Sequence, residues 1–311
     1  MAINYVCDLH GHTNRSDGND SPKEFIDHAA ELGMKIVAIT DHDVIPPVTI
    51  EVDGEIVDTV EYAASKGVKL LLGIEISCET FIDDVHLVCF GCDWSGAYFE
   101  SLEMMVIESK IGGYRKLVEE LTAHGMPMTW EEVLENGGNP VTEEFVQKKM
   151  IFELMARKGY CESWKEAKLF VKENKDIVVK RIKPAALSVI NEMHRIGGTV
   201  IMAHPYLVTE PINFHGAEIT RKQYIEILME AGLDGIEASY TYDKTSYSGT
   251  MTKDEIEKEI KELYGDKLII SGGSDYHNDG KKGVENPRDI GDSGITMDEF
   301  MSQKGLVALL P

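Results

Sequence analysis

Short apolar segments rich in β-branched residues recur along the chain, and most of the segments between them carry apolar residues at helical spacing. Near-continuous apolar runs are typical of parallel strands that are covered on both faces. The predicted strands are residues 5–9, 35–40, 68–73, 85–91, 199–203, 235–238, 267–271 and 306–309. Strands that alternate with helices predict βαβ units, and therefore an α/β barrel or an open parallel sheet.

Helix starts are marked by capping residues. Ser21 is followed by Glu24, which predicts a capping box, and Pro22 stands at the first helical position. The same type of start occurs at Thr220 and Thr252, each ahead of an apolar stripe with helical spacing. These starts place helices between the predicted strands.

The alternation of strands and helices stops between about residues 97 and 183. That stretch predicts a run of helices at residues 111–123, 129–135, 142–158 and 163–175. The simplest organisation is a helical subdomain, residues 97–183, inserted into an α/β body formed by residues 1–96 and 184–311.

Composition narrows the class of protein. The chain has 311 residues, 43% of them hydrophobic and 27% charged, which is ordinary globular usage and excludes a mostly disordered chain. The sequence contains no run of about 18 apolar residues, so it predicts no membrane span. The N-terminus lacks the basic and apolar regions of a signal peptide, so we expect a cytoplasmic protein.

The charge balance is strongly acidic, with 31 Lys plus Arg against 54 Asp plus Glu, a formal charge of −23. A field of this sign repels a phosphate backbone, so nucleic acid as a docked partner and an anionic membrane surface are both disfavoured. A small anionic substrate would need a site where the charge is locally reversed, for example by bound divalent cations. The oligomeric state is not predicted.

Residues that can bind metals follow the ends of several predicted strands. They are His10, His12, Asp17, His42, Glu75, His86, His204, Asp275 and His277. The carboxyl ends of parallel barrel strands converge on one face, so these side chains are expected to meet. A single His or Asp at a strand end is more often a structural group, but their recurrence favours a metal site. Imidazole and carboxylate suit Zn, Mn or Fe. Nine ligands exceed what one tetrahedral ion needs, which predicts two or three divalent ions with Glu75 as a bridge.

Six sequence blocks resemble, in order, those of the polymerase and histidinol phosphatase (PHP) family. The blocks are DLHGHTNRSDG, AITDHD, GIEIS, VHLVCFG, MAHP and GGSDYH. The inserted helical segment resembles that of the small-molecule phosphoesterase branch, the TrpH-type proteins. The resemblance implies a distorted (β/α)7 barrel with a trinuclear metal site that hydrolyses phosphate esters.

The resemblance also implies a division of the ligands among three ions. The first ion would be held by His10, His12, Glu75 and Asp275. The second would be held by Glu75, His86 and His204, and the third by Asp17, His42 and His277. Some relatives have His where Asp17 stands here.

The metal site suggests a mechanism. A bound cation lowers the pKa of its water towards about 7. We hypothesise that a hydroxide bridging the first two ions attacks phosphorus while the third ion binds a phosphate oxygen. Glu75, His204 and Asp275 are the predicted catalytic residues, and Asp41 is expected to orient a ligand imidazole.

Substrate contacts are predicted at Lys148, Arg15 and Tyr240. Lys148 interrupts an apolar helical stripe, so it is either a lysine with its amine in water or a phosphate contact. The resemblance favours the phosphate contact, because relatives carry an arginine there, although Met150 replaces their histidine. Arg15 lies in the ligand loop, and Tyr240 belongs to a tyrosine-rich loop able to stack on a base or sugar.

The predicted function is metal-dependent hydrolysis of a small phosphorylated metabolite, with nucleotides as the leading substrate class. Histidinol phosphate and a ribose cyclic phosphate are the alternative substrates. A non-catalytic metal-binding regulatory module is an alternative of another class, disfavoured because all ligand positions are filled. A polymerase-associated exonuclease is disfavoured by the charge of −23 and by the chain length.

Overall fold

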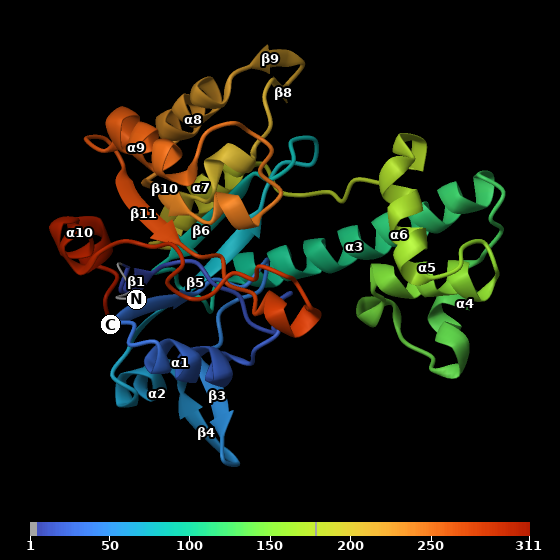
Figure 1. The fold of residues 1–311 in the computed structure, drawn as a ribbon, viewed down its shortest axis with the longest axis horizontal. Coiled ribbons are helices and arrows are strands. Elements are labelled where there is room, and N and C mark those ends of the chain that lie inside the picture. Colours follow the sequence, from blue (N-terminus) through green and yellow to red (C-terminus); the bar gives the residue numbers. More distant parts are fainter. Residues whose placement is uncertain (1–4, 178) are drawn as a thin grey trace. The chain divides into compact units, whose positions relative to one another are not determined.

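The computed structural model describes residues 5–177 and 179–311, and these residues divide into two compact units. Unit 1 comprises the chain up to Glu100 together with Pro184–Pro311, and unit 2 is Ser101–Lys183. Figure 1 labels their helices and strands. Within the part of the chain that the structure describes, no helix combines the length and apolar character needed to cross a lipid bilayer.

Among the described residues of unit 1, seven strands form one sheet in the order β1-β2-β5-β6-β7-β10-β11. They are β1 (Cys7–Asp8), β2 (Ile36–Ile39), β5 (Lys69–Ser77), β6 (His86–Phe90), β7 (Thr199–Met202), β10 (Gly235–Tyr240) and β11 (Ile269–Gly273). The two outermost strands also meet, because the backbone N–H of Leu9 donates to the carbonyl of Gly272 at 3.1 Å. The sheet is therefore a nearly closed barrel, which confirms the predicted distorted α/β barrel.

The expectation of a wholly parallel sheet is wrong at β6. This strand runs antiparallel to both β5 and β7, whereas the other neighbouring pairs are parallel. The connection between Ser77 and His86 is shorter than the dozen or so residues that a parallel crossover needs, so β6 returns directly beside β5. Ser77 pairs with His86, which places the start of β6 beside the carboxyl end of β5.

Helices cover the barrel on both sides. They are α1 (Pro22–Glu31), α2 (Thr59–Ser65), α7 (Ala186–Arg195), α8 (Arg221–Glu230), α9 (Lys253–Tyr264), α10 (Met297–Ser302) and α11 (Lys304–Val307). In Figure 1, α1 and α2 lie on one side of the sheet and α7, α8 and α9 on the other. The capping boxes predicted at Ser21, Thr220 and Thr252 are all present. Short 3₁₀ turns follow three strands: η4 (Pro205–Leu207), η5 (Tyr242–Lys244) and η6 (Asp279–Lys282).

The predicted strand at residues 306–309 is wrong, because this segment belongs to α11 and the turn after it. Leu306 and Phe300 are fully buried and pack on the cluster inside the barrel, to which Leu9 and Ala38 contribute. Gln303 bonds the backbone N–H and carbonyl of Ile270 through its side chain. The periodicity of a four-residue apolar run does not distinguish a strand from one helical turn. In this segment the packing against the barrel favours the helix.

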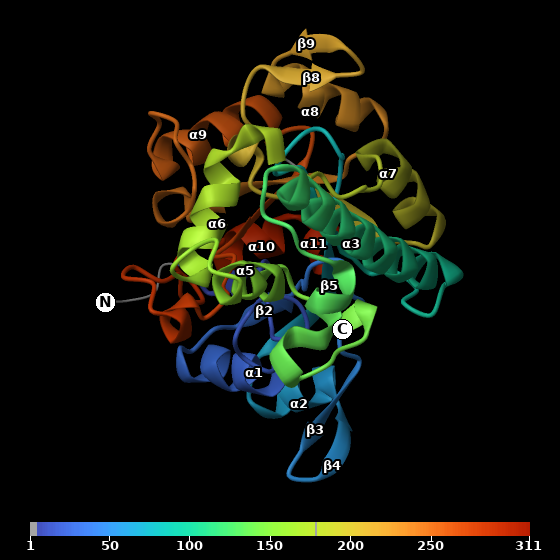
Figure 2. The same ribbon diagram turned by 90° about the vertical axis from the view of Figure 1, so that its right-hand side faces the viewer.

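Two hairpins extend from unit 1 and were not predicted. They are formed by β3 (Thr49–Val52) with β4 (Glu55–Asp58), and by β8 (Ile212–Phe214) with β9 (Ala217–Ile219). Figure 2 shows them at opposite ends of this unit, away from the barrel strands.

Unit 2 is helical and has a core of its own. Its elements are α3 (Ala97–Ala123), whose first turn belongs to unit 1, then α4 (Trp130–Glu135), η1 (Asn136–Gly138), η2 (Glu143–Phe145), α5 (Lys148–Arg157), α6 (Trp164–Glu173) and η3 (Lys175–Ile177). The single helix predicted at residues 142–158 is divided, because Val146 is extended and fully buried in the core of this unit. Phe145 is consequently exposed, whereas Phe152 and Met155 are buried.

Candidate metal centre

The structure brings all nine predicted metal ligands together at one edge of the barrel. His10 and His12 follow β1, His42 follows β2, and His204 follows β7. Asp275 and His277 follow β11, Glu75 lies in β5, and Asp17 lies in the loop before α1. His86 begins β6, and because this strand is antiparallel, its first residue reaches the same edge as the carboxyl ends of the others.

Glu75 lies at the centre of the cluster and is only 1% exposed. Its Oε2 atom lies 3.1 Å from Nε2 of His10, Nε2 of His12 and Nδ1 of His42. Its Oε1 atom lies 2.9 Å from Nδ1 of His86 and 3.0 Å from Nε2 of His204. Each carboxylate oxygen thus faces a different group of imidazoles, which is the arrangement that a bridging carboxylate requires.

Among the residues that the structure describes, three groups of side chains have potential ligand atoms within 4.8 Å of one another. The groups are His10, His12, Glu75 and Asp275; then His12, Asp17, His42 and His277; and then His42, Glu75 and His86. The first has the members expected for the first ion. The second contains the set expected for the third ion, with His12 added. In the last group His42 stands where His204 was expected, although Nε2 of His204 also reaches Glu75.

The candidate ligand atoms fit a metal because several of them are buried without a hydrogen-bond partner in the described part of the chain. Among the described residues, the buried atoms without a hydrogen bond include Nε2 of His10, both ring nitrogens of His12, Nδ1 of His42, Nδ1 of His204 and Oε2 of Glu75. Leaving a buried polar atom unsatisfied costs about 1–3 kcal/mol. Imidazole and carboxylate together are the donor set that Zn, Mn and Fe accept.

The cluster also shifts the pKa values of its members. Burial would raise the pKa of Glu75, but the charges of His42, His10 and His86 hold it well below its usual range. Burial lowers the pKa of His42 to about 3, assisted by the charges of His12 and His86. Glu75 is therefore a carboxylate at pH 7, as a metal-bridging carboxyl group must be.

Glu237 supports two of these residues and was not singled out from the sequence. It lies in β10, is 2% exposed, and its Oε1 atom lies 3.2 Å from Nδ1 of His10. Its Oε2 atom accepts from the backbone N–H of His204 at 2.8 Å. Asp41, expected to orient an imidazole, instead accepts from the backbone and hydroxyl of Thr13 and from Ser16. Asp41 thus fixes the loop that carries Asp17.

The predicted substrate contacts lie in different places. Tyr240 is the last residue of β10 rather than part of a loop, and its hydroxyl donates to Oδ2 of Asp275 at 2.7 Å. Arg15 is exposed and donates to the carbonyl of Ile45. Lys148 begins α5 in unit 2, with its amine 5.9 Å from the ring centre of Phe152. Burial and the charge of Arg181 lower its pKa.

A cavity of about 260 Å³ opens beside the ligands. Its lining includes Glu75, His204, Tyr240 and Asp275, together with two basic residues, Lys244 and Arg288. Arg288 was not predicted, because it lies in the loop 13 residues after Asp275, at no recognisable motif spacing.

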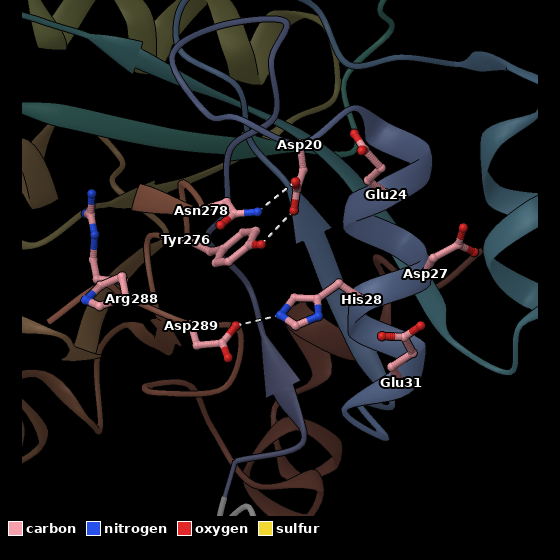
Figure 3. A pocket seen from close by; sticks show the side chains of 10 residues that line it. Asp20, Glu24, Asp27, His28, Glu31, Tyr276, Asn278, Arg288 and Asp289 are labelled. Atoms are coloured by element: carbon pink, nitrogen blue, oxygen red, sulfur yellow. Dashed lines mark hydrogen bonds and ion pairs between the residues drawn. The ribbon is translucent and has the colours of Figure 1, made fainter. Parts of the chain in front are cut away.

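A second cavity, of about 470 Å³, lies beside α1 and also includes Arg288 in its lining (Figure 3). Its acidic side chains are Asp20, Glu24, Asp27, Glu31 and Asp289. Asp20 accepts from Tyr276 and Asn278, and Asp289 pairs with His28. A phosphate group would be repelled by these carboxylates, and within the described residues none of them belongs to a group of side chains placed to hold a cation that would offset this charge.

Known proteins resemble this chain along most of its length. The PHP domain profile matches residues 8–274. A 3',5'-nucleoside bisphosphate phosphatase from Chromobacterium violaceum is 24% identical over 91% of this chain and 90% of its own length. A phosphoribosyl 1,2-cyclic phosphate 1,2-diphosphodiesterase from Eggerthella lenta is 24% identical over 88% and 94%. A 5'-3' exoribonuclease from Haemophilus influenzae is 25% identical over 64% and 68%.

A solved structure supports the fold independently. It is a protein from Bifidobacterium adolescentis described as a metal-dependent phosphoesterase, with a TM-score of 0.65 at 24% identity. The match covers 95% of this chain and 94% of that protein.

Proposed function

The chain belongs to the PHP domain family of metal-dependent phosphoesterases, and we propose that it hydrolyses a phosphate ester of a small, nucleotide-type metabolite. The observation that carries this proposal is the group of five imidazoles around the buried carboxylate of Glu75, contributed by His10, His12, His42, His86 and His204. Several of their buried nitrogens have no hydrogen-bond partner among the described residues, which favours a metal-binding role over a structural one.

The proposed site holds two or three divalent ions, Zn, Mn or Fe. The first ion is assigned to His10, His12, Glu75 and Asp275. The second is assigned to Glu75, His86 and His204, and the third to Asp17, His42 and His277. When bound, such ions supply a hydroxide nucleophile near neutral pH and neutralise charge on the phosphoryl oxygens.

The chain's own residues prepare this chemistry. Glu75, His204 and Asp275 are the proposed catalytic residues, because each lines the cavity where the ester would lie. Tyr240 and Arg288 both donate to Oδ2 of Asp275, which leaves Oδ1 to face the imidazoles of His10 and His12. Glu237 contacts Nδ1 of the His10 ring, so the Nε2 atom of His10 faces Glu75.

Relatives guide the choice of substrate. The bisphosphate phosphatase matches over nearly the whole chain, which supports a nucleotide-type ester. A ribose cyclic phosphate is the second candidate, because the diphosphodiesterase matches over a similar length. Histidinol phosphate stays an alternative from the sequence alone. The exoribonuclease match covers less of the chain, and the charge of −23 disfavours a long RNA.

Tyr240, Lys148 and Arg15 remain proposed substrate contacts. Tyr240 has the most direct support, since it lines the cavity. For Lys148, the support is the like charge of nearby Arg181, since two neighbouring cations would favour a bound anion. For Arg15, it is the position in the loop between His12 and Asp17. We also propose that the protein docks neither nucleic acid nor an anionic membrane surface, on the formal charge of −23.

The proposal is tested by ester hydrolysis, followed as phosphate release from monoesters and bisphosphates and as ring opening of cyclic phosphates. Protein loaded with Mn²⁺ or Zn²⁺ is assayed on p-nitrophenyl phosphate and then on a panel of nucleoside monophosphates, nucleoside bisphosphates, cyclic phosphates and histidinol phosphate. We expect metal-dependent hydrolysis that is abolished in Glu75→Gln. A metal-loaded protein that neither releases phosphate from a monoester or bisphosphate nor opens a cyclic phosphate to a monoester would instead support the non-catalytic regulatory module.

A further inference from the structure

Arg288 lies between η6 and α10, and its side chain lines the same cavity as Glu75 and His204. This side chain is only 14% exposed, so its charge is largely withdrawn from water. A buried charge is costly unless it is paired and hydrogen-bonded. The position of Arg288 therefore requires partners for its guanidinium.

Two carboxylates supply part of this pairing. Nη1 of Arg288 donates to Oδ2 of Asp275, and Nη2 donates to Oδ2 of Asp279 at 3.0 Å. Nε is buried and has no hydrogen-bond partner among the described residues. Because a guanidinium has five N–H donors, these two contacts leave donors for a further acceptor at the cavity.

The backbone that carries Arg288 is fixed in place. Nζ of Lys244 donates to the carbonyl of Pro287 at 3.0 Å and to Asp292 at 2.8 Å. The carboxylate of Asp292 also accepts from the backbone N–H of Asp289 at 2.6 Å. These bonds hold the residues on both sides of Arg288, so the guanidinium would need little rearrangement to meet a ligand.

We propose that Arg288 donates hydrogen bonds to the phosphoryl group that undergoes hydrolysis, with Asp279 holding the guanidinium in position. This inference rests on the proposed function. The carboxylates that line the cavity, Glu75, Asp84 and Asp275, would otherwise repel a phosphate ester. A guanidinium presents a planar pair of donors that matches two phosphoryl oxygens, and such charge-assisted bonds are the strong ones.

Two variants of Arg288 and one of its partner test the proposal, each loaded with the same metal. Arg288→Met removes the charge and the donors, and Arg288→Lys keeps a point charge without the paired donors. Asp279→Asn weakens the positioning contact without altering a proposed metal ligand. The matched control is Arg195→Met, because Arg195 is exposed on α7 and pairs with Glu192.

The measurements are the inhibition constant of inorganic phosphate, KM and kcat for p-nitrophenyl phosphate, and the metal equivalents bound. In Arg288→Met we expect the phosphate inhibition constant and KM to rise by about 10- to 100-fold with metal content unchanged. Arg288→Lys should recover part of this loss, Asp279→Asn should show a smaller rise, and Arg195→Met should match the unmodified protein.

Other results would overturn the inference. If Arg288→Met loses metal but binds phosphate normally once metal is restored, Arg288 acts only through Asp275. If KM rises for a nucleoside bisphosphate but not for p-nitrophenyl phosphate, Arg288 contacts a second phosphate and not the reacting one. The unmodified protein provides the separate test of the proposed function, because absence of any hydrolysis of the phosphate esters in the panel would remove that function itself.

Discussion

The Oε1 atom of Glu237 lies 3.2 Å from Nδ1 of His10, and both side chains are almost fully buried. With one ring nitrogen held in this way, the other nitrogen of His10 faces Oε2 of Glu75 at 3.1 Å. Carboxylates that bond the outer nitrogen of a ligand imidazole fix its tautomer and orientation. The proposed metal site therefore involves β10, a strand that provides none of the nine proposed ligands.

Replacing Glu237 should weaken metal binding. We expect Glu237→Gln to lower metal affinity by about 10- to 100-fold, because the amide no longer supplies the negative charge that orients His10. The measurement is a competition titration with a chromogenic chelator. Glu262→Gln is the control, since Glu262 is 66% exposed on α9. Equal affinities in the two variants would contradict this role of Glu237.

Replacing His204 should affect turnover more than folding. In His204→Ala we expect kcat for p-nitrophenyl phosphate to fall about 100-fold or more, because each 1.4 kcal/mol lost in the transition state is a factor of ten. The comparison is His124→Ala, since His124 is exposed at the end of α3. Near-normal turnover in a His204→Ala protein with verified metal content would refute the assignment of His204.

The metal-free protein should lose stability as the pH rises from about 6.5 to 9. The carboxylates of Asp275 and Glu75 raise the pKa of His12 from 6.5 to about 9 although burial opposes this. Because the pKa of His12 is higher in the folded than in the unfolded protein, the charged imidazole makes its full contribution to stability below about pH 6.5. This contribution is lost as the pH rises through about 9.

This pH effect is measured by urea unfolding in the presence of a chelator at pH 6.5, 8 and 9.5. His12→Gln should flatten the pH dependence, because the titrating imidazole is removed. A metal-free protein that is equally stable across this range, or more stable at pH 9.5, would contradict the prediction.

The clustering of the candidate ligands could be predicted from the sequence because most of them lie at strand ends. His10, His42 and Asp275 each follow a strand that could be predicted from a run of apolar residues. The barrel geometry then brings the three side chains together. Glu237 and Arg288 could not be found in this way. Glu237 lies within an apolar strand, and the partners of Arg288 are defined only once β11 and the following loop are in place.

The direction of β6 also could not be predicted from the sequence. An apolar run predicts a buried strand but not its orientation, and His86 was placed early in this strand without a reason why it should face the other ligands. The short connection from Ser77 gives that reason, since an antiparallel return puts His86 at the carboxyl end of β5.

The helical assignment of the C-terminal segment gives a prediction for stability. Leu306 is fully buried against the barrel interior, so Leu306→Ala should lower the free energy of unfolding by about 2–5 kcal/mol. Leu169→Ala is the control, because Leu169 is 52% exposed. Urea unfolding at pH 7 measures both, and a Leu306→Ala protein as stable as the control would contradict the packing of α11.

The most direct test of the metal centre is the number of ions bound per chain. Purified protein is stripped, reloaded with Zn²⁺ or Mn²⁺, passed through a desalting column and analysed by elemental mass spectrometry. We predict two to three equivalents for the unmodified chain and a loss of at least one in Glu75→Gln, the carboxylate that faces all five imidazoles. One equivalent or fewer in the unmodified chain, or an undiminished number in Glu75→Gln, would contradict a multinuclear site built around Glu75.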